Sequence, residues 1–177
     1  RGRRGRTWHA PMGNLYLSII VNPDIHPKDC GQLAFLSAMS VVELVLTLMG
    51  PDTDVEVKWP NDVLVKNKKL SGILIEKQGQ YYIIGVGINV MAAPEEAIGL
   101  QDLSDKRLPI HPLRDLFLDI FNAYYTRWQN EGFEPIREQW MRRAAYLNQE
   151  IRVKLENKEK TGVFLEIESN GALVLKR

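Results

Sequence analysis

The alternation of apolar and polar positions predicts a chain rich in short strands. Residues 15–21 (LYLSIIV) form a run of apolar, partly β-branched side chains after the turn-like segment 11–14, which is typical of a strand. Residues 56–65, 69–76 and 81–90 have the same character, and the polar separators between them are short. Short separators favour consecutive antiparallel hairpins over crossover connections. From residue 150 onward, alternation predicts three further short strands.

Apolar positions that recur with the period of a helix, rather than at every second residue, predict three helices. The apolar positions of residues 30–49 almost encircle a helix, so we expect this helix to be deeply buried, with Asp29 as its N-cap and Gly50 as its stop signal. Spacings of three and four predict a second helix around residues 113–124 and a shorter third one over 136–147. Polar side chains interrupt the first helix, which indicates a core helix rather than a membrane span.

Composition narrows the class of protein. With 177 residues we expect one domain or slightly more, and 45% apolar with 25% charged residues is typical of a globular fold. A net charge of +1 gives no overall electrostatic field that would attract nucleic acid or an anionic membrane. One cysteine, Cys30, can form neither an intramolecular disulfide nor a thiolate zinc site, and no signal peptide is visible, so we expect a cytoplasmic protein without membrane association.

The first six residues, RGRRGR, combine planar five-donor cations with a freely adaptable backbone. Such a loop can wrap an anion such as a phosphate group. A disordered basic tail is the alternative interpretation, and a nucleic-acid tail in which Trp8 stacks on a base is a further one.

Two other motifs carry candidate chemistry. Lys58 opens the sequence KWPND, where Pro60 cannot donate to a strand ladder, so a bend there directs Lys58 away from the sheet and toward a ligand anion. The alternative is an ordinary solvated lysine. Gly85 and Gly87 interrupt a strong strand that ends at Asn89, which indicates either a close approach to the backbone or a bulge. The three histidines share no metal-ligand spacing, so we expect no metal site.

Taken in order, these motifs resemble those of one family, the biotin protein ligases. The resemblance rests on RGRRGR with Trp8, NLYLS at residues 14–18, KWPNDV at 58–63, KLSGILIE at 69–76 and IGVGIN at 84–89. It covers nearly the whole chain in the order of the family.

The resemblance implies an α+β fold like that of class II aminoacyl-tRNA synthetases and lipoate ligases. We therefore expect a mixed sheet flanked by helices over residues 1–147, followed by a small SH3-like β domain over 148–177 that is partial. In the family, a Ser/Thr-Asn segment and a Gln that hold biotin precede the Gly/Arg loop. We therefore expect the N-terminal portion of the catalytic domain to be absent from this chain.

The resemblance also implies a reaction. Biotin and ATP give biotinoyl-5′-AMP, and the biotinoyl group then passes to a lysine of a biotin carboxyl carrier domain in a biotin-dependent carboxylase, with Mg²⁺ accompanying ATP. Transferred residue by residue, it assigns catalysis to Lys58 and Arg3, biotin binding to Arg1, Gly2, Arg3, Tyr16, Lys58, Gly72 and Gly85, and nucleotide binding to Arg3, Arg4, Arg6, Trp8 and Asn89.

Alternatives remain open at this point. A lipoate-type ligase would use the same fold, and a non-catalytic phosphate- or nucleic-acid-binding regulatory module would use the Arg loop without turnover. A homodimer could form if an exposed sheet edge pairs across a two-fold axis. Nucleic-acid binding is expected only if a winged-helix domain precedes Arg1 in a longer protein, as it does in some family members.

Overall fold

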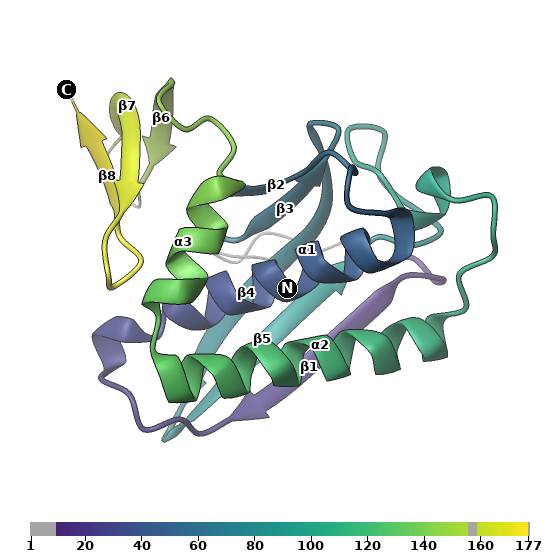
Figure 1. Ribbon diagram of the computed structural model, residues 1–177, viewed down its shortest axis with the longest axis horizontal. Helices are drawn as coiled ribbons and strands as arrows, with labels where there is room; N and C mark the ends of the chain where they lie inside the picture. Colours follow the sequence, from purple (N-terminus) through teal and green to yellow (C-terminus); the bar gives the residue numbers. More distant parts are fainter. Residues whose placement is uncertain (1–9, 156–158, 177) are drawn as a thin grey trace.

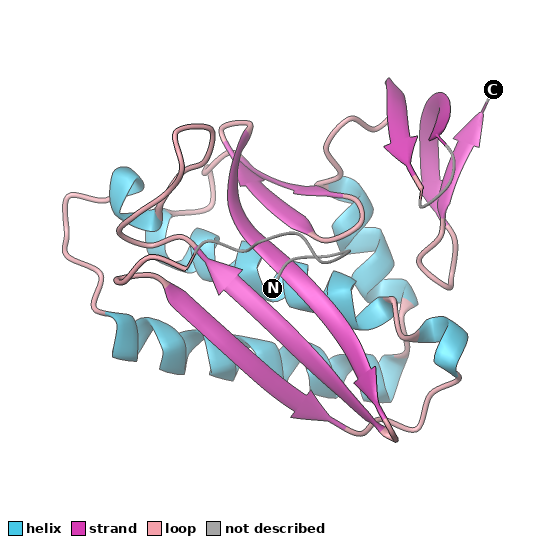
Figure 2. Cartoon of the chain, turned by 180° about the vertical axis from the view of Figure 1, so that it is seen from behind, coloured by secondary structure: helices cyan, strands magenta, loops and turns pink. Residues whose placement is uncertain are grey.

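A layer of helices lies against one face of a five-stranded sheet, and a three-stranded sheet lies at one end of the molecule (Figure 1). The computed structural model describes residues 10–155 and 159–176. Seen from behind, the larger sheet faces the viewer and the helices lie beyond it (Figure 2). One face of this sheet is therefore covered by helices.

The five strands are ordered β1-β5-β4-β3-β2, and all their pairings are antiparallel. Parallel pairing in the described residues is limited to two isolated bridges, Val57 with Ala144 and Lys69 with Ala97. The predicted consecutive hairpins are confirmed for the later strands. The strands are β1 (Leu15–Val21), β2 (Val55–Lys58), β3 (Asp62–Val65), β4 (Lys68–Gln78) and β5 (Tyr81–Ile88).

The expectation of a single strand over residues 56–65 is wrong. Lys58 pairs directly with Asp62, so residues 59–61 form a turn between two short strands. Pro60 lies in this turn, and proline has no N–H to donate to a ladder. The change of direction places Lys58 at the end of β2, as the bend predicted from Pro60 requires.

The helices follow the predicted order, although their ends differ from the expected ones. The expected N-cap at Asp29 is wrong, because a short 3-10 turn, η2 (Pro27–Asp29), ends there and the N-cap of the first helix is Gly31. The predicted stop is confirmed, since Gly50 ends that helix with φ of 98°. The helices are α1 (Gln32–Met49), α2 (Ile110–Glu131) and α3 (Glu134–Arg142), with a second short 3-10 turn, η3 (Leu100–Leu103).

The helix α1 is the centre of the core, as expected from its apolar surface. Together with η2, the segment Pro27–Met49 is long and apolar enough to cross a membrane by length and composition. Most of α1 is instead buried against the sheet and α2, and Leu33, Leu36 and Leu44 have no exposed surface. Burial by the protein itself accounts for its hydrophobicity.

The C-terminal strands form a separate antiparallel sheet, as predicted. It contains β6 (Glu150–Lys154), β7 (Glu159–Ile167) and β8 (Leu173–Lys176) in that order. Phe164 of β7 packs on Trp140 of α3, whose ring also contacts Phe35 of α1 at a centroid distance of 5.0 Å. The turn before β8 is held by a hydrogen bond of 3.1 Å from the Trp59 indole N–H to the Gly171 carbonyl. The small sheet is thus anchored beside the corner that carries Lys58.

Trp140 joins the small sheet to the helix α1, and only 1% of its surface is exposed. Replacing it by alanine should lower the free energy of unfolding by about 3–5 kcal/mol, because a large buried side chain is removed. Urea unfolding followed by circular dichroism measures this change. Tyr81→Ala, at a half-exposed position, is the control and should change stability by less than about 1 kcal/mol. A loss below about 1 kcal/mol for Trp140→Ala would contradict the anchoring role.

Candidate functional site

One residue from each strand of the five-stranded sheet lies in a single row across it. Directly paired residues present their side chains on the same face of a sheet. The neighbours of these residues, such as Val57, Val63 and Val86, are buried on the helix side, so the row lies on the face without helices (Figure 2). The row consists of Lys58, Asp62, Gly72, Gly87 and Tyr16.

The row brings together several residues that the sequence singled out. Lys58 and Tyr16 lie at its two ends, and Gly72 lies between them. At the usual strand spacing of about 4.8 Å, the row is roughly 19 Å long. Gly85 lies two residues before Gly87 on the same face, and Asn89 follows the end of β5 directly. Arg1, Gly2, Arg3, Arg4, Arg6 and Trp8 lie outside the described residues.

Glycine makes the middle of this face shallow. Gly72 and Gly87 are paired with each other, and Gly85 is paired with Leu74 on β4. Among the described residues, a Cβ atom at Gly85 would meet only the Leu74 carbonyl oxygen at 3.6 Å and the Leu74 Cβ at 3.7 Å. These are ordinary contacts, so packing of the described residues does not require glycine there. The missing side chain leaves room over the sheet for a flat ligand.

A second lysine reaches the row from β4. The ammonium group of Lys69 lies 2.6 Å from a carboxylate oxygen of Asp62. The pairing of β3 with β4 shifts register between Val63 and Leu64, and such a bulge redirects the side chains around it. Lys58 and Lys69 thus place two ammonium groups at this end of the row, beside the carboxylate of Asp62.

Sequence reasoning did not assign a role to Lys69. Its position in KLSGILIE supported the resemblance, but simple alternation gives no sign of the bulge that brings it to Asp62. The available signal is a lysine that lies two residues after the tight turn at Lys66 and Asn67 and three residues before a strand glycine.

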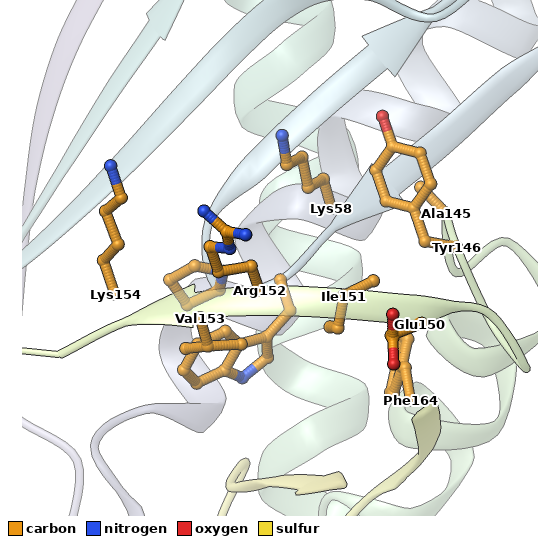
Figure 3. Close-up of a pocket in the computed structure, with 11 residues that line it drawn as sticks. Lys58, Ala145, Tyr146, Glu150, Ile151, Arg152, Val153, Lys154 and Phe164 are labelled. Atoms are coloured by element: carbon orange, nitrogen blue, oxygen red, sulfur yellow. The ribbon is translucent and has the colours of Figure 1, made fainter. Parts of the chain in front are cut away.

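Lys58 also borders a cavity of about 370 Å³ between the two sheets. The walls are the corner Trp59–Pro60, the residues Ala145 and Tyr146, strand β6 and Phe164. The Lys58 ammonium lies 5.6 Å from the centre of the Tyr146 ring, within the range of a cation–π contact. Figure 3 shows the charged ends of Lys58, Arg152 and Lys154 directed to the same side. The cavity therefore continues this end of the row toward the small sheet.

Asn89 connects the end of β5 with β4. Its side-chain amide donates to the Lys69 carbonyl at 3.3 Å, and its backbone N–H donates to the Leu70 carbonyl at 2.9 Å. The Tyr16 hydroxyl accepts a bond of 3.1 Å from the Asn14 amide. The Asn89 side chain is thus oriented by β4, and the Tyr16 hydroxyl by the residue that precedes β1.

A carboxyl group beside Lys58 responds to pH. Burial, assisted by the negative charge of Asp54, raises the pKa of Glu56 above its usual value. Glu56 lies two residues before Lys58, on the same face of β2. As the pH falls, Glu56 is neutralised earlier than an ordinary glutamate, so this edge becomes more positive.

Two protein-family models match the chain. The Biotin/lipoate A/B protein ligase family matches residues 1–89, and the Biotin protein ligase C terminal domain matches residues 146–177. A biotin--[acetyl-CoA-carboxylase] ligase of Paracoccus denitrificans is 34% identical over 99% of this chain and 79% of its own length. The bifunctional ligase/repressor BirA of Escherichia coli is 32% identical, and this chain spans 58% of its length.

Solved structures show the same fold. The biotin protein ligase from Aquifex aeolicus in complex with biotin and ATP superposes with a TM-score of 0.87, at 28% identity, over 99% of this chain and 76% of that one. The ligase from Leishmania major in complex with biotinyl-5-AMP gives a TM-score of 0.70 at 27% identity, over 99% and 79% of the two chains. The expected α+β fold, with its small C-terminal β domain, is confirmed.

Replacement by alanine should affect stability differently at Gly85 and at Gly171. Gly85→Ala should change the free energy of unfolding by less than about 1 kcal/mol, because the new methyl group meets only ordinary contacts. Gly171→Ala should cost at least about 1 kcal/mol, since Gly171 has φ of 83° and its Cβ would lie 2.9 Å from the Phe35 ring. Chemical denaturation of both variants measures the difference. Equal losses would show that Gly85 is required by packing.

Proposed function

We infer that this chain, which belongs to the biotin/lipoate A/B protein ligase family, is an ATP-dependent ligase that activates biotin and attaches it to a carrier protein. The observation that carries the inference is the row across the helix-free face, with a glycine floor in the middle and two lysines at one end. The Paracoccus relative is named for this ligation, and the Aquifex ligase was solved with biotin and ATP.

In the first half-reaction, a carboxylate oxygen of biotin attacks the α-phosphorus of ATP. The bond from the α-phosphorus to the bridging oxygen breaks, and the products are biotinoyl-5′-AMP and pyrophosphate. Two unit charges about 4 Å apart repel by roughly 4 kcal/mol at an effective dielectric constant near 20. Lys58 and Lys69 offset this repulsion, and no general base is needed because the carboxylate is already ionised.

In the second half-reaction, the amine of an acceptor lysine attacks the acyl carbon of the adenylate. The bond from this carbon to the AMP oxygen breaks, an amide forms, AMP leaves and the amine releases a proton to water. The acceptor is a biotin carboxyl carrier domain, which is the partner expected for this family. Among the described residues, the helices lie on the other face of the sheet, which leaves the acyl group reachable by such a protein (Figure 2).

We assign the binding roles of individual residues from their positions in and beside the row. Biotin lies over Gly72 and Gly85 with Tyr16 as a wall, and adenosine lies toward Asn89. Gly85 supports this placement, because among the described residues a Cβ there would make only ordinary contacts with Leu74. For the residues outside the described ranges we keep the roles implied by the family: Arg1 and Gly2 at biotin, Arg3 at biotin and in catalysis, and Arg3, Arg4, Arg6 and Trp8 at the nucleotide.

Mg²⁺ enters with ATP in this proposal and is held mainly by the phosphates, as is usual for nucleotide substrates. Bound Mg²⁺ neutralises phosphate charge. Residues 1–147 form the catalytic domain and 148–177 the C-terminal β domain, a division supported by the two separate sheets. We place the reaction in the cytoplasm, which fits a chain with a single cysteine.

Ligation is favoured over the non-catalytic nucleic-acid-binding alternative. The chain has a net charge of +1, which supplies no broad basic surface for phosphate backbones. Repression is stated in the name of the Escherichia coli relative, of which this chain spans 58%. Nucleic-acid binding is therefore not part of the function that we propose for these residues.

We also propose that two copies pair through β1. Within the described ranges, β1 bonds to β5 alone, whereas the opposite edge strand is covered, because the Val57 N–H donates to the Arg143 carbonyl at 2.9 Å. The edge strand β1 carries no charged residue, and Ile20 is 67% exposed. An uncharged edge can pair with a copy of itself in antiparallel fashion.

Sedimentation equilibrium tests this pairing. The unmodified protein should form a dimer, and Ile20→Lys should shift it to the monomer, because lysine on an edge strand opposes pairing. Leu118→Lys, at another exposed apolar position, which lies on α2, should leave the dimer unchanged. A monomeric unmodified protein, or equal dissociation by both variants, would contradict pairing through β1.

Single-turnover formation of biotinoyl-5′-AMP tests the role of the lysines. Lys58→Ala should slow this step by roughly 100- to 1000-fold, by analogy with the loss of one preorganised charge donor. Lys69→Ala should slow it at least as much, since Lys69 reaches the row from β4. Lys77→Ala is the matched control, because the Lys77 ammonium also lies 5.6 Å from a ring centre, that of Tyr82, away from the row.

Three outcomes would count against this account. No adenylate from the folded, unmodified protein would contradict the proposed function. A Lys58→Ala rate within about threefold of the unmodified rate would remove Lys58 from catalysis. A loss in Lys77→Ala as large as in Lys58→Ala would show that the effect is not specific to the row.

A further inference from the structure

The side chain of Asn14 is a buried polar group that the reaction described above does not use. Asn14 is 8% exposed and directly precedes β1. Its carboxamide oxygen accepts the backbone N–H groups of Val90, Met91 and Ala92 at 2.8, 3.0 and 3.1 Å. Its amide nitrogen donates to the Ala92 carbonyl at 2.6 Å and to the Tyr16 hydroxyl at 3.1 Å. One side chain thus makes five hydrogen bonds.

These bonds join two parts of the site that are far apart in the sequence. The segment 90–92 begins directly after Asn89, where we place adenosine, and Tyr16 stands at the end of the row where we place biotin. The three N–H groups converge on one oxygen, so removal of that oxygen leaves three donors to find new partners. Such a loss would allow the segment after Asn89 to move.

The neighbouring glycine makes this reach possible. Gly13 has φ of 91°, and a Cβ there would lie 3.2 Å from the Met91 Cβ. Only a residue without a side chain lets the turn before β1 approach Met91 so closely in this conformation. Gly13 and Asn14 therefore act together, one by allowing the approach and the other by bonding across it.

We propose that Asn14 is a positioning residue that holds Tyr16 and the segment after Asn89 as one unit, so that the biotin and adenosine ends of the site keep their spacing. This inference rests on the proposed function. The role needs an amide, because the group must accept from three N–H donors and also donate to a carbonyl. Aspartate would keep the acceptor but would place a second oxygen against the Ala92 carbonyl. The side chains of serine and alanine are too short to reach the segment 90–92.

The test compares Asn14→Ala with Gln101→Ala. The Gln101 side-chain amide also bonds three backbone groups, the carbonyls of Ser104 and Lys106 and the N–H of Leu108. The bond of Gln101 to the segment 90–92 runs from its backbone N–H to the Val90 carbonyl, and alanine keeps that N–H. For Asn14→Ala, the KM values for biotin and ATP in pyrophosphate exchange should each rise about 10- to 100-fold, which is the size expected of a displacement near 1 Å. Gln101→Ala should leave both KM values within about twofold of the unmodified protein.

Hydrogen exchange gives a readout that does not depend on activity. In Asn14→Ala, the amides of residues 90–92 should exchange at least about 10-fold faster, while the paired amides of β4 and β5 keep their protection. Unchanged exchange of these amides, or unchanged KM values in a folded variant, would overturn the positioning role. An inactive unmodified protein whose 90–92 amides still depend on Asn14 would refute the ligase function and leave the structural link intact.

Asn14→Asp covers the case in which Asn14→Ala does not fold. It keeps an acceptor for the three N–H groups and has no donor for the Ala92 carbonyl. The KM for biotin should then rise more than about threefold, with protection at residues 90–92 largely retained. A KM for biotin equal to that of the unmodified protein would overturn the proposal.

Discussion

The register of the five-stranded sheet is the constraint on which the site depends. Lys58, Asp62, Gly72, Gly87 and Tyr16 share one face only because each is paired with its present neighbour. A slip of one residue in any pairing would turn the side chains of one strand toward the helices. Lysine would then be buried in the core, and valine would face the ligand side.

Several local interactions hold this register. Lys66 and Asn67 both have positive φ, which suits a tight hairpin between β3 and β4. Asn61 bonds across the sheet, because its carbonyl accepts the Ile73 N–H and its side-chain amide donates to the Ile73 carbonyl. The buried hydroxyl of Ser71 donates to the Gly87 carbonyl at 2.7 Å. Each of these bonds lies beside a residue of the row, so the same groups stabilise the fold and position the site.

The sequence predicted those parts of the structure that follow from local pattern. The first strand matched, because its apolar run has clear turn signals before and after it, and Gly50 ended α1 because its φ of 98° suits glycine. Asp29 failed as an N-cap, since a 3-10 turn occupies that place and local sequence does not reveal it. Lys69 was missed because the bulge between Val63 and Leu64 depends on the pairing of two strands. Non-local pairing therefore accounts for most of what the pattern could not predict.

The most direct test of this account is ATP–pyrophosphate exchange by the purified protein with biotin, with lipoate and with neither. A carboxylate must attack the α-phosphorus before labelled pyrophosphate can return to ATP, so exchange reports the first half-reaction alone. We predict exchange that appears only when biotin is present. Exchange supported by lipoate would assign the protein to the other substrate class of its family, and no exchange by folded protein would contradict the account of the row as an adenylate-forming site.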